Sequence, residues 1–102
     1  MKKVINNRLY NTETATCVGT FDNGYEDNDF KAVTEQLYRK KTGEFFLYGW
    51  GGAMTNYAER CGSNSWGSGE AINPLSIEQA KEWAEEHLSG DKYIEIFGEV
   101  QE

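Results

Sequence analysis

Carboxylates are the chemically active side chains with the most regular spacing in this sequence. Glu78, Glu82 and Glu86 recur every fourth residue, and Glu85 stands beside the last of them. In a helix over residues 77–88 they would share one face about 6 Å apart, because an α-helix rises about 1.5 Å per residue. Rows of this kind are usually solvated helix faces. The functional interpretation is a row of negative charges that occupies a cationic groove of a partner protein.

A second group of carboxylates lies in DNGYEDND, residues 22–29. Its members are Asp22, Glu26, Asp27 and Asp29. The segment lacks the alternating ligands and the terminal glutamate of a calcium-binding loop, so we expect no metal site there. We interpret it as an acidic loop that competes with the glutamate row for the same basic partner. We favour the row, because a helix holds its charges in place whereas a loop must be ordered on binding.

The residue types that carry other chemistry lack their usual companions. His87 is the single histidine, and no nucleophile pattern accompanies it. Cys17 and Cys61 lack metal-ligand spacing, so we expect two reduced and packed cysteines. The GWGG segment, residues 49–52, lacks the lysine of a phosphate-binding loop. We therefore expect a protein that is not an enzyme and has neither a cofactor nor a bound metal.

The balance of charge limits the class of partner. The 102-residue chain has a net charge of −7, and residues 76–102 hold two basic against eight acidic side chains. Nucleic-acid binding needs clustered lysine and arginine, so we expect no direct binding of DNA or RNA. A protein with a basic surface is favoured as the partner.

Length and composition predict one globular domain over residues 1–102. No apolar run approaches the roughly 20 residues of a membrane span. The first residues, MKKVINNRLY, have no apolar segment behind their lysines. We therefore expect no membrane insertion, no secretory signal and a cytoplasmic location.

The elements that must position these residues begin with strands. Residues 4–5 and 8–10 flank Asn6-Asn7, which predicts a tight hairpin because asparagine tolerates positive φ. Residues 16–21 are rich in β-formers and predict the next strand.

The central hairpin is predicted to carry two apolar faces. Residues 33–40 and 44–50 are joined by Lys41-Thr42-Gly43, which suits a type I turn followed by a glycine bulge. The register predicts three facing pairs, Tyr38 with Phe46, Gln36 with Tyr48 and Thr34 with Trp50, and leaves Val33, Leu37, Phe45 and Leu47 on the other face. We expect helices to cover the Tyr48 and Trp50 face. Partial exposure is the alternative, and it would make these two rings an apolar anchor for a partner.

The second half of the chain predicts helices. The glycines within residues 49–52 are expected to end the strand before a short helix over residues 53–60, and Trp66 is expected to be core. The main helix has Ser76 as N-cap and Gln79 in a capping box. Its predicted buried stripe is Ile77, Ala80, Trp83, Ala84 and Leu88, and its predicted C′ residue is Gly90. A second helix over 91–97, capped by Asp91, is favoured over a strand.

Together these elements predict an α+β fold. It consists of a small antiparallel sheet of four to five strands with a C-terminal helix packed on one face through Trp83.

Three segments carry a resemblance to a known family: LYRKKTGEFFLYGWGGAMTNYAE (37–59), PLSIEQAKEWAEEHL (74–88) and YIEIFGEV (93–100). The chain resembles small proteins of phages and mobile elements of Gram-positive bacteria, a group that includes type II-A anti-CRISPR inhibitors. The resemblance implies an inhibitor in the bacterial host cell that binds the CRISPR effector nuclease and blocks guide RNA loading or target DNA engagement. It transfers no catalytic residue.

Two other functions remain open beside this one. The first is an acidic interaction protein of a phage or plasmid that acts on another basic host protein. The second is a small hydrolase or nuclease with an unrecognised carboxylate site, since 17 acidic residues always offer some pair.

Overall fold

The computed structural model describes residues 1–26, 28–63 and 65–101, and its centre is a four-stranded antiparallel sheet in the order β3-β4-β5-β8. These strands are β3 (Thr16–Asp22), β4 (Val33–Arg39), β5 (Phe45–Gly51) and β8 (Gly69–Leu75). Helices α1 (Ile77–His87) and α2 (Gly90–Phe97) follow β8. This is the α+β fold predicted from the sequence.

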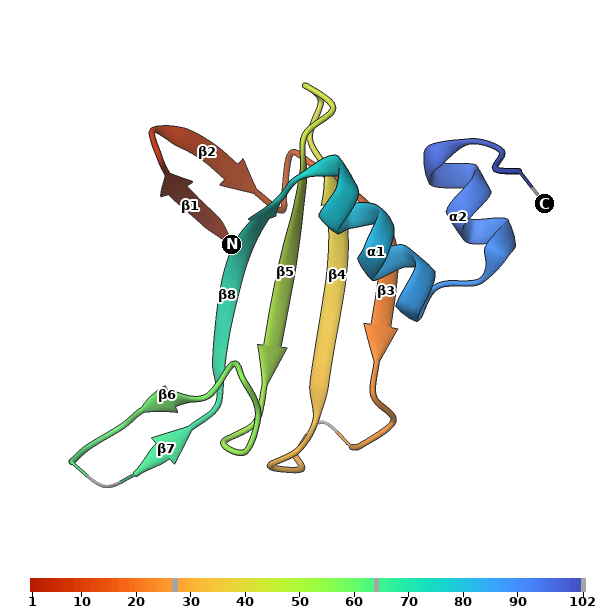
Figure 1. Cartoon of the computed structure of the whole chain (residues 1–102). Coiled ribbons are helices and arrows are strands. Elements are labelled where there is room, and N and C mark those ends of the chain that lie inside the picture. The colour runs from red at the N-terminus through yellow and green to blue at the C-terminus, as the bar shows by residue number, and fades with distance from the viewer. Residues whose placement is uncertain (27, 64, 102) are drawn as a thin grey trace.

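Two small hairpins extend from opposite ends of the sheet (Figure 1). One is formed by β1 (Lys2–Ile5) and β2 (Arg8–Asn11), the other by β6 (Glu59–Arg60) and β7 (Trp66–Gly67). Asn6 and Asn7 have φ of 49° and 66°, as expected for the predicted tight turn between β1 and β2. The observed sheet therefore contains a different set of strands from the predicted one. Strands β1 and β2 pair only with each other, and the sheet includes β8, which was not among the predicted strands.

The β4–β5 hairpin has the predicted turn and register. Gly43 has φ of 93°, and the Lys40 amide donates to the Glu44 carbonyl oxygen at 2.7 Å. All three expected pairs are present, Tyr38 with Phe46, Gln36 with Tyr48 and Thr34 with Trp50. The tight turn fixed the register, and the register in turn fixed which side chains share a face.

Helix α1 packs on the Leu37 face of the sheet through Trp83, as predicted. Trp83 is 8% exposed and lies in a buried cluster of Leu37, Phe45, Leu47, Ala80, Trp83 and Ala84. The Ser76 and Gln79 capping box is also confirmed. Ile77, which we expected in the buried stripe, is 46% exposed. It opens the helix where the chain leaves β8, so its neighbours cover only part of its side chain.

The junction of the two helices differs from the predicted glycine cap. Leu88 ends α1 in an extended conformation, and Gly90 is the first residue of α2. Ser89 caps α2 by accepting from the Lys92 amide at 3.2 Å, a role that we expected of Asp91. A serine N-cap satisfies a free helical N–H, so the chain starts the second helix without a glycine turn. The predicted helix over residues 91–97 is confirmed.

The segment after β5 departs most from expectation. Strand β5 continues to Gly51, one residue past its predicted end at Trp50, and residues 53–58 form turns in place of the expected helix. The reason is close packing against β5. A Cβ on Gly49 would lie 2.1 Å from the Tyr57 ring, and one on Gly51 would lie 2.4 Å from the Thr55 hydroxyl oxygen. The turns therefore lie directly on the glycine positions of the strand.

Three side chains expected to be packed lie at the surface. Trp66 is 57% exposed in the small β6–β7 hairpin, which projects from the sheet. Cys61 follows β6 and is exposed for the same reason. Cys17 is free, as expected, but it is exposed because it lies on an edge strand.

The two edges of the main sheet are interrupted. Strand β3 has a register shift between Cys17 and Gly19, and β8 contains Pro74 opposite Phe46. A Cβ on Gly19 would lie 2.7 Å from a Leu88 methyl carbon, so the glycine lets the end of α1 approach β3 closely. Neither described helix is long and apolar enough to cross a membrane.

Candidate partner-binding surface

The face of the main sheet turned away from α1 is called the open face here. Strand pairing arranges its residues in three rows: Pro74, Phe46, Tyr38 and Cys17; then Ile72, Tyr48, Gln36 and Thr20; then Glu70, Trp50, Thr34 and Asp22. Because side chains alternate along a strand, each row lies on the same side of the sheet. The open face therefore brings together aromatic side chains from β4 and β5 with carboxylates from the two edge strands.

The β1–β2 hairpin covers one end of the open face. Tyr10 packs edge-on against Phe46 with ring centroids 5.5 Å apart, and Tyr38 stacks on Phe46 at 5.1 Å. Phe46 is 0% exposed as a result. Our expectation that helices cover this face is wrong. Both helices follow β8 and pack on the opposite side, so only the short hairpin is left to cover the open face.

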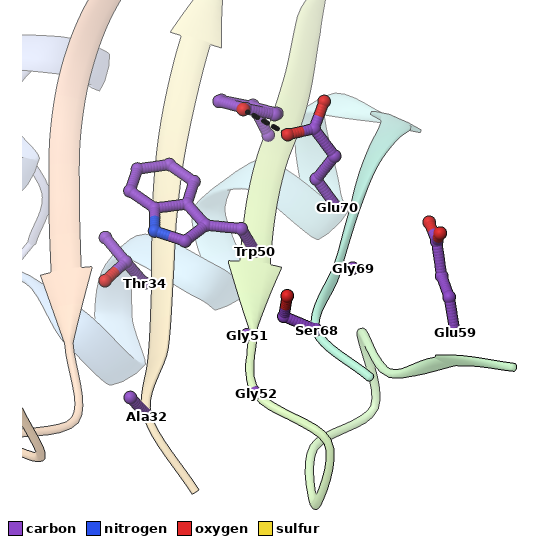
Figure 2. Close-up of a pocket in the computed structure, with 10 residues that line it drawn as sticks. Ala32, Thr34, Trp50, Gly51, Gly52, Glu59, Ser68, Gly69 and Glu70 are labelled. Carbon is purple, nitrogen blue, oxygen red and sulfur yellow. Dashed lines mark hydrogen bonds between the residues drawn. The ribbon is translucent and has the colours of Figure 1, made fainter. Parts of the chain in front are cut away.

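The other end of the open face is hollowed and half exposed (Figure 2). We call this hollow of about 640 Å³ the aromatic pocket, lined by Ala32, Thr34, Tyr48, Trp50, Gly51, Gly52, Glu59, Ser68, Gly69 and Glu70. The rings of Tyr48 and Trp50 meet at 42° with centroids 5.1 Å apart. Ring faces at this angle form an apolar corner into which a side chain of another protein can fit.

A hydrogen bond orients one carboxylate of the pocket. The Tyr48 hydroxyl donates to Oε2 of Glu70 at 3.1 Å, as Figure 2 shows by its dashed line. Burial and this contact with Glu70 both raise the pKa of Tyr48, so the phenol stays protonated and the carboxylate keeps its donor. Oε1 of Glu70 remains available for a further donor.

Glycines bring the second carboxylate to the pocket. A Cβ on Gly69 would lie 2.1 Å from the Tyr57 carbonyl oxygen and 2.5 Å from Cγ of Glu59. The chain from Tyr57 to Glu59 therefore packs directly against the start of β8. This contact places Glu59 on the pocket wall. Within the described part of the chain, neither Glu59 nor Glu70 is in an ion pair, and no lysine or arginine lines the pocket.

Glu35, on the helix side of the sheet, links the turns over residues 53–58 to α1. Glu35 accepts one hydrogen bond from the Tyr57 hydroxyl and another, 2.9 Å long, from the Trp83 indole. Burial, followed by the bond to Glu35, raises the pKa of Tyr57 well above its usual range. Because Glu35 joins the 53–58 turns to α1, the pocket wall is fixed to the packed side of the molecule.

The predicted glutamate row lies far from this pocket in the architecture. Glu78, Glu82, Glu85 and Glu86 are all exposed on α1. Glu86 places Oε2 3.6 Å from Nε2 of His87. The sheet separates α1 from Tyr48 and Trp50. The structure therefore does not bring the glutamate row and the predicted aromatic anchor together.

The predicted acidic loop is exposed, and two of its carboxylates stabilise its turns. Asp22 accepts from the Gly24 amide at 2.7 Å, and Asp29 accepts from the Lys31 amide at 2.8 Å. Glu26 is exposed, and Asp27 lies outside the described residues. Asp22 shares its row with Trp50 and Glu70, so the structure places one end of this loop on the open face, outside the lining of the aromatic pocket.

Glu59 and Glu70 are the residues that the sequence interpretation missed. Glu59 belongs to the segment that we assigned to a helix, and Glu70 lies outside every strand that we predicted, so no strand alternation pointed to them. Glu70 directly precedes Ala-Ile-Asn-Pro-Leu (71–75), a segment that pairs with β5 despite its proline, and no pattern around Glu59 points to the pocket.

In residues 1–26, 28–63 and 65–101, no three His, Cys, Asp or Glu side chains form a group that could hold a metal ion. Comparisons of the chain with protein-family models, with curated proteins and with solved structures find no match.

Proposed function

We propose that this protein is an inhibitor that binds the type II-A CRISPR effector nuclease through its open face. The observation that carries the binding role is the half-exposed Tyr48 and Trp50 pair beside two carboxylates without an ion pair in the described chain. Interface cores are enriched in tryptophan and tyrosine, and complementary charge at their rims sets partner and orientation.

The choice of target rests on the resemblance to the phage and mobile-element family and on charge. Such an effector holds its guide–target heteroduplex in a positively charged channel. A chain with a net charge of −7 is attracted to that channel and repelled by the nucleic acid that would otherwise fill it. Bound there, the protein blocks guide RNA loading or target DNA engagement.

The open face is the better docking surface because it combines apolar area with charge. The glutamate row on α1 offers charge alone, and exposed ion pairs contribute at most about 1 kcal/mol each. Two aromatic rings supply area that a partner can remove from water. We therefore assign the anchor to Tyr48 and Trp50, and the glutamate row becomes the alternative that the variants below test.

The function is tested by guided DNA cleavage with a purified type II-A effector. We expect the protein to suppress cleavage and to form a complex with the effector on size-exclusion chromatography. Addition before the guide RNA inhibits more strongly if guide loading is blocked, whereas order has no effect if target engagement is blocked. Full cleavage at a large molar excess, with no complex formed, would refute the proposal.

Two charge reversals test the docking surface. Glu59→Lys with Glu70→Lys reverses the pocket, and Glu82→Lys with Glu86→Lys reverses the same number of charges on α1. We expect the first pair to abolish complex formation and the second to retain it. Loss of binding in the α1 pair alone would assign docking to the helix instead.

A further inference from the structure

We infer that the aromatic pocket receives an arginine side chain of the protein partner. This inference rests on the proposed function, since it assumes that the open face meets a protein. It identifies the chemical group that the pocket binds. The four side chains that carry it are Tyr48, Trp50, Glu59 and Glu70.

The first reason is the pairing of ring faces with carboxylates. A cation over the face of tryptophan or tyrosine is attracted by the ring quadrupole. Figure 2 shows the Trp50 indole reaching from β5 toward Thr34, with Glu70 and Glu59 on the β8 side of Trp50. A cation in the pocket therefore shares its lining with two negatively charged side chains. A neutral apolar group in the same place would remove carboxylates from water without compensation.

The second reason is that the chain supplies cations to other rings but not to these. Lys40 lies 4.4 Å from the centroid of the Tyr10 ring, and Arg60 lies 5.8 Å from that of Trp66. Lys81 lies 6.0 Å from that of Phe97. Among the described residues, no lysine or arginine lies over Tyr48 or Trp50. The ring pair with carboxylates beside it is thus the one left for a cation from another molecule.

The third reason distinguishes arginine from lysine. A guanidinium is planar, so it stacks on an indole while its N–H groups point outward in a fixed fork. Glu70 already uses Oε2 to accept from Tyr48, which holds its carboxylate in one orientation and leaves Oε1 to accept from the fork. Charge-assisted hydrogen bonds of this kind are shorter and stronger than those between neutral groups. A lysine ammonium stays more strongly hydrated and gains less from the flat ring.

A nucleic-acid base is the competing occupant, because bases also stack on aromatic side chains. Its attached phosphates would face Glu59 and Glu70, with no lysine or arginine in the pocket lining to offset them. Electrostatics therefore favours arginine, and the experiment includes a short oligothymidine as a separate arm.

The test is a nuclear magnetic resonance titration of the isotope-labelled full chain with N-acetyl-arginine N-methylamide. Its uncharged isostere, the citrulline derivative, is the matched probe, and the lysine derivative is the third. We expect saturable shifts of the Trp50 indole signal with a Kd in the millimolar range for a single side chain. We expect binding about tenfold weaker for citrulline and several-fold weaker for lysine. The buried Trp83 signal should not move, and exposed Trp66 reports non-specific contact.

Matched variants complete the test. Glu70→Gln should weaken arginine binding about tenfold, whereas Glu82→Gln on α1 should leave it unchanged. Unchanged spectra away from the pocket show that each variant is folded. The inference is overturned if Trp50 does not shift, if citrulline binds as well as arginine, or if oligothymidine binds more tightly than arginine.

The titration contains no nuclease, so the two proposals can fail separately. Arginine binding without inhibition of any effector would overturn the proposed target and leave the pocket assignment standing. Inhibition by a protein that does not bind the arginine probe would overturn the pocket assignment alone.

Discussion

The two faces of the main sheet have nearly the same pattern of apolar residues but differ in how completely those residues are buried. On one face Leu37, Phe45 and Leu47 lie beneath α1 and are sealed by Trp83. On the other face Phe46 is buried beneath Tyr10, whereas Tyr48 and Trp50 remain half exposed. The difference arises because both helices follow β8 and stay on one side, so the short β1–β2 hairpin covers only part of the other. Equal patterning therefore need not lead to equal burial.

One segment serves both faces. Within residues 49–51, Gly49 and Gly51 point to the helix side and leave room for Tyr57 and Thr55. Trp50 points the opposite way, into the aromatic pocket. The two glycines allow close packing on the helix side of the strand, and the tryptophan places an aromatic ring on the open face. The packed face holds the buried cluster beneath α1, and our proposal assigns binding to the open face.

The largest expected effect is on the packed face. Trp83→Ala should lower the free energy of unfolding by about 3–5 kcal/mol, because it removes a large core side chain and leaves a cavity. Urea denaturation followed by circular dichroism measures the change. An unchanged unfolding midpoint would show that Trp83 does not seal the core.

The Glu35 link between the faces should have an intermediate effect. Glu35→Gln replaces a carboxylate that accepts from both Tyr57 and Trp83 with an amide that cannot accept both bonds equally well. We expect a loss of about 1–3 kcal/mol of stability, typical of leaving a partly buried donor unsatisfied. Glu78→Gln, on the exposed surface of α1, is the control and should change stability by less than about 0.5 kcal/mol. Equal effects of the two variants would contradict the proposed link.

Trp50→Ala should weaken binding more than it lowers the stability of the fold. Its side chain is half exposed, so we expect a stability loss of about 1 kcal/mol. Binding to the effector should weaken by about 2 kcal/mol or more, the range of interface hot spots. Calorimetry of unfolding and of binding measures both quantities. A large stability loss with unchanged binding would place Trp50 in the core and remove it from the interface.

The smallest expected effect is on how the stability of the fold changes at acid pH. Hydrogen bonds from Thr42 and Lys40 lower the pKa of Glu44 below its ordinary value of 4.5, with a further contribution from Arg8 of the covering hairpin. A depressed carboxyl pKa stabilises the fold above pH 4.5, and the stabilisation is lost as the pH falls through the lower folded value.

Glu44→Gln should therefore be less stable than the parent at pH 6, and the difference should shrink toward pH 3. Urea midpoints at the two pH values measure it. A difference that does not change with pH would mean that the charge of Glu44 does not stabilise the fold.

The parts of the fold that the sequence predicted are those with local physical signals. Gly43 fixed the central register, and Ser76 with Gln79 fixed the start of α1. The missed parts depend on contacts distant in sequence. Strand β8 was missed, and it accommodates Pro74 because it is an edge strand.

The residues of the candidate site also divide into those that a local sequence signal predicted and those that depend on contacts distant in sequence. Tyr48 and Trp50 were found because they lie on a strand whose partner was certain from its turn. Glu70 joins them only through the pairing of β5 with β8, and Glu59 only through the close approach at Gly69. No periodicity within one segment contains that information.

The interrupted edges of the sheet bear on how the protein behaves when concentrated. Growth of fibrils requires an uninterrupted row of amide and carbonyl groups onto which another chain can add a strand. Pro74 removes one amide hydrogen from β8, and the irregularity at Cys17 and Gly19 disrupts the repeat of β3. Exposed aromatic rings are a hazard for self-assembly in most sheets. Here both edges are interrupted, so another chain finds no regular edge onto which to add a strand, even though Tyr48 and Trp50 are only partly buried.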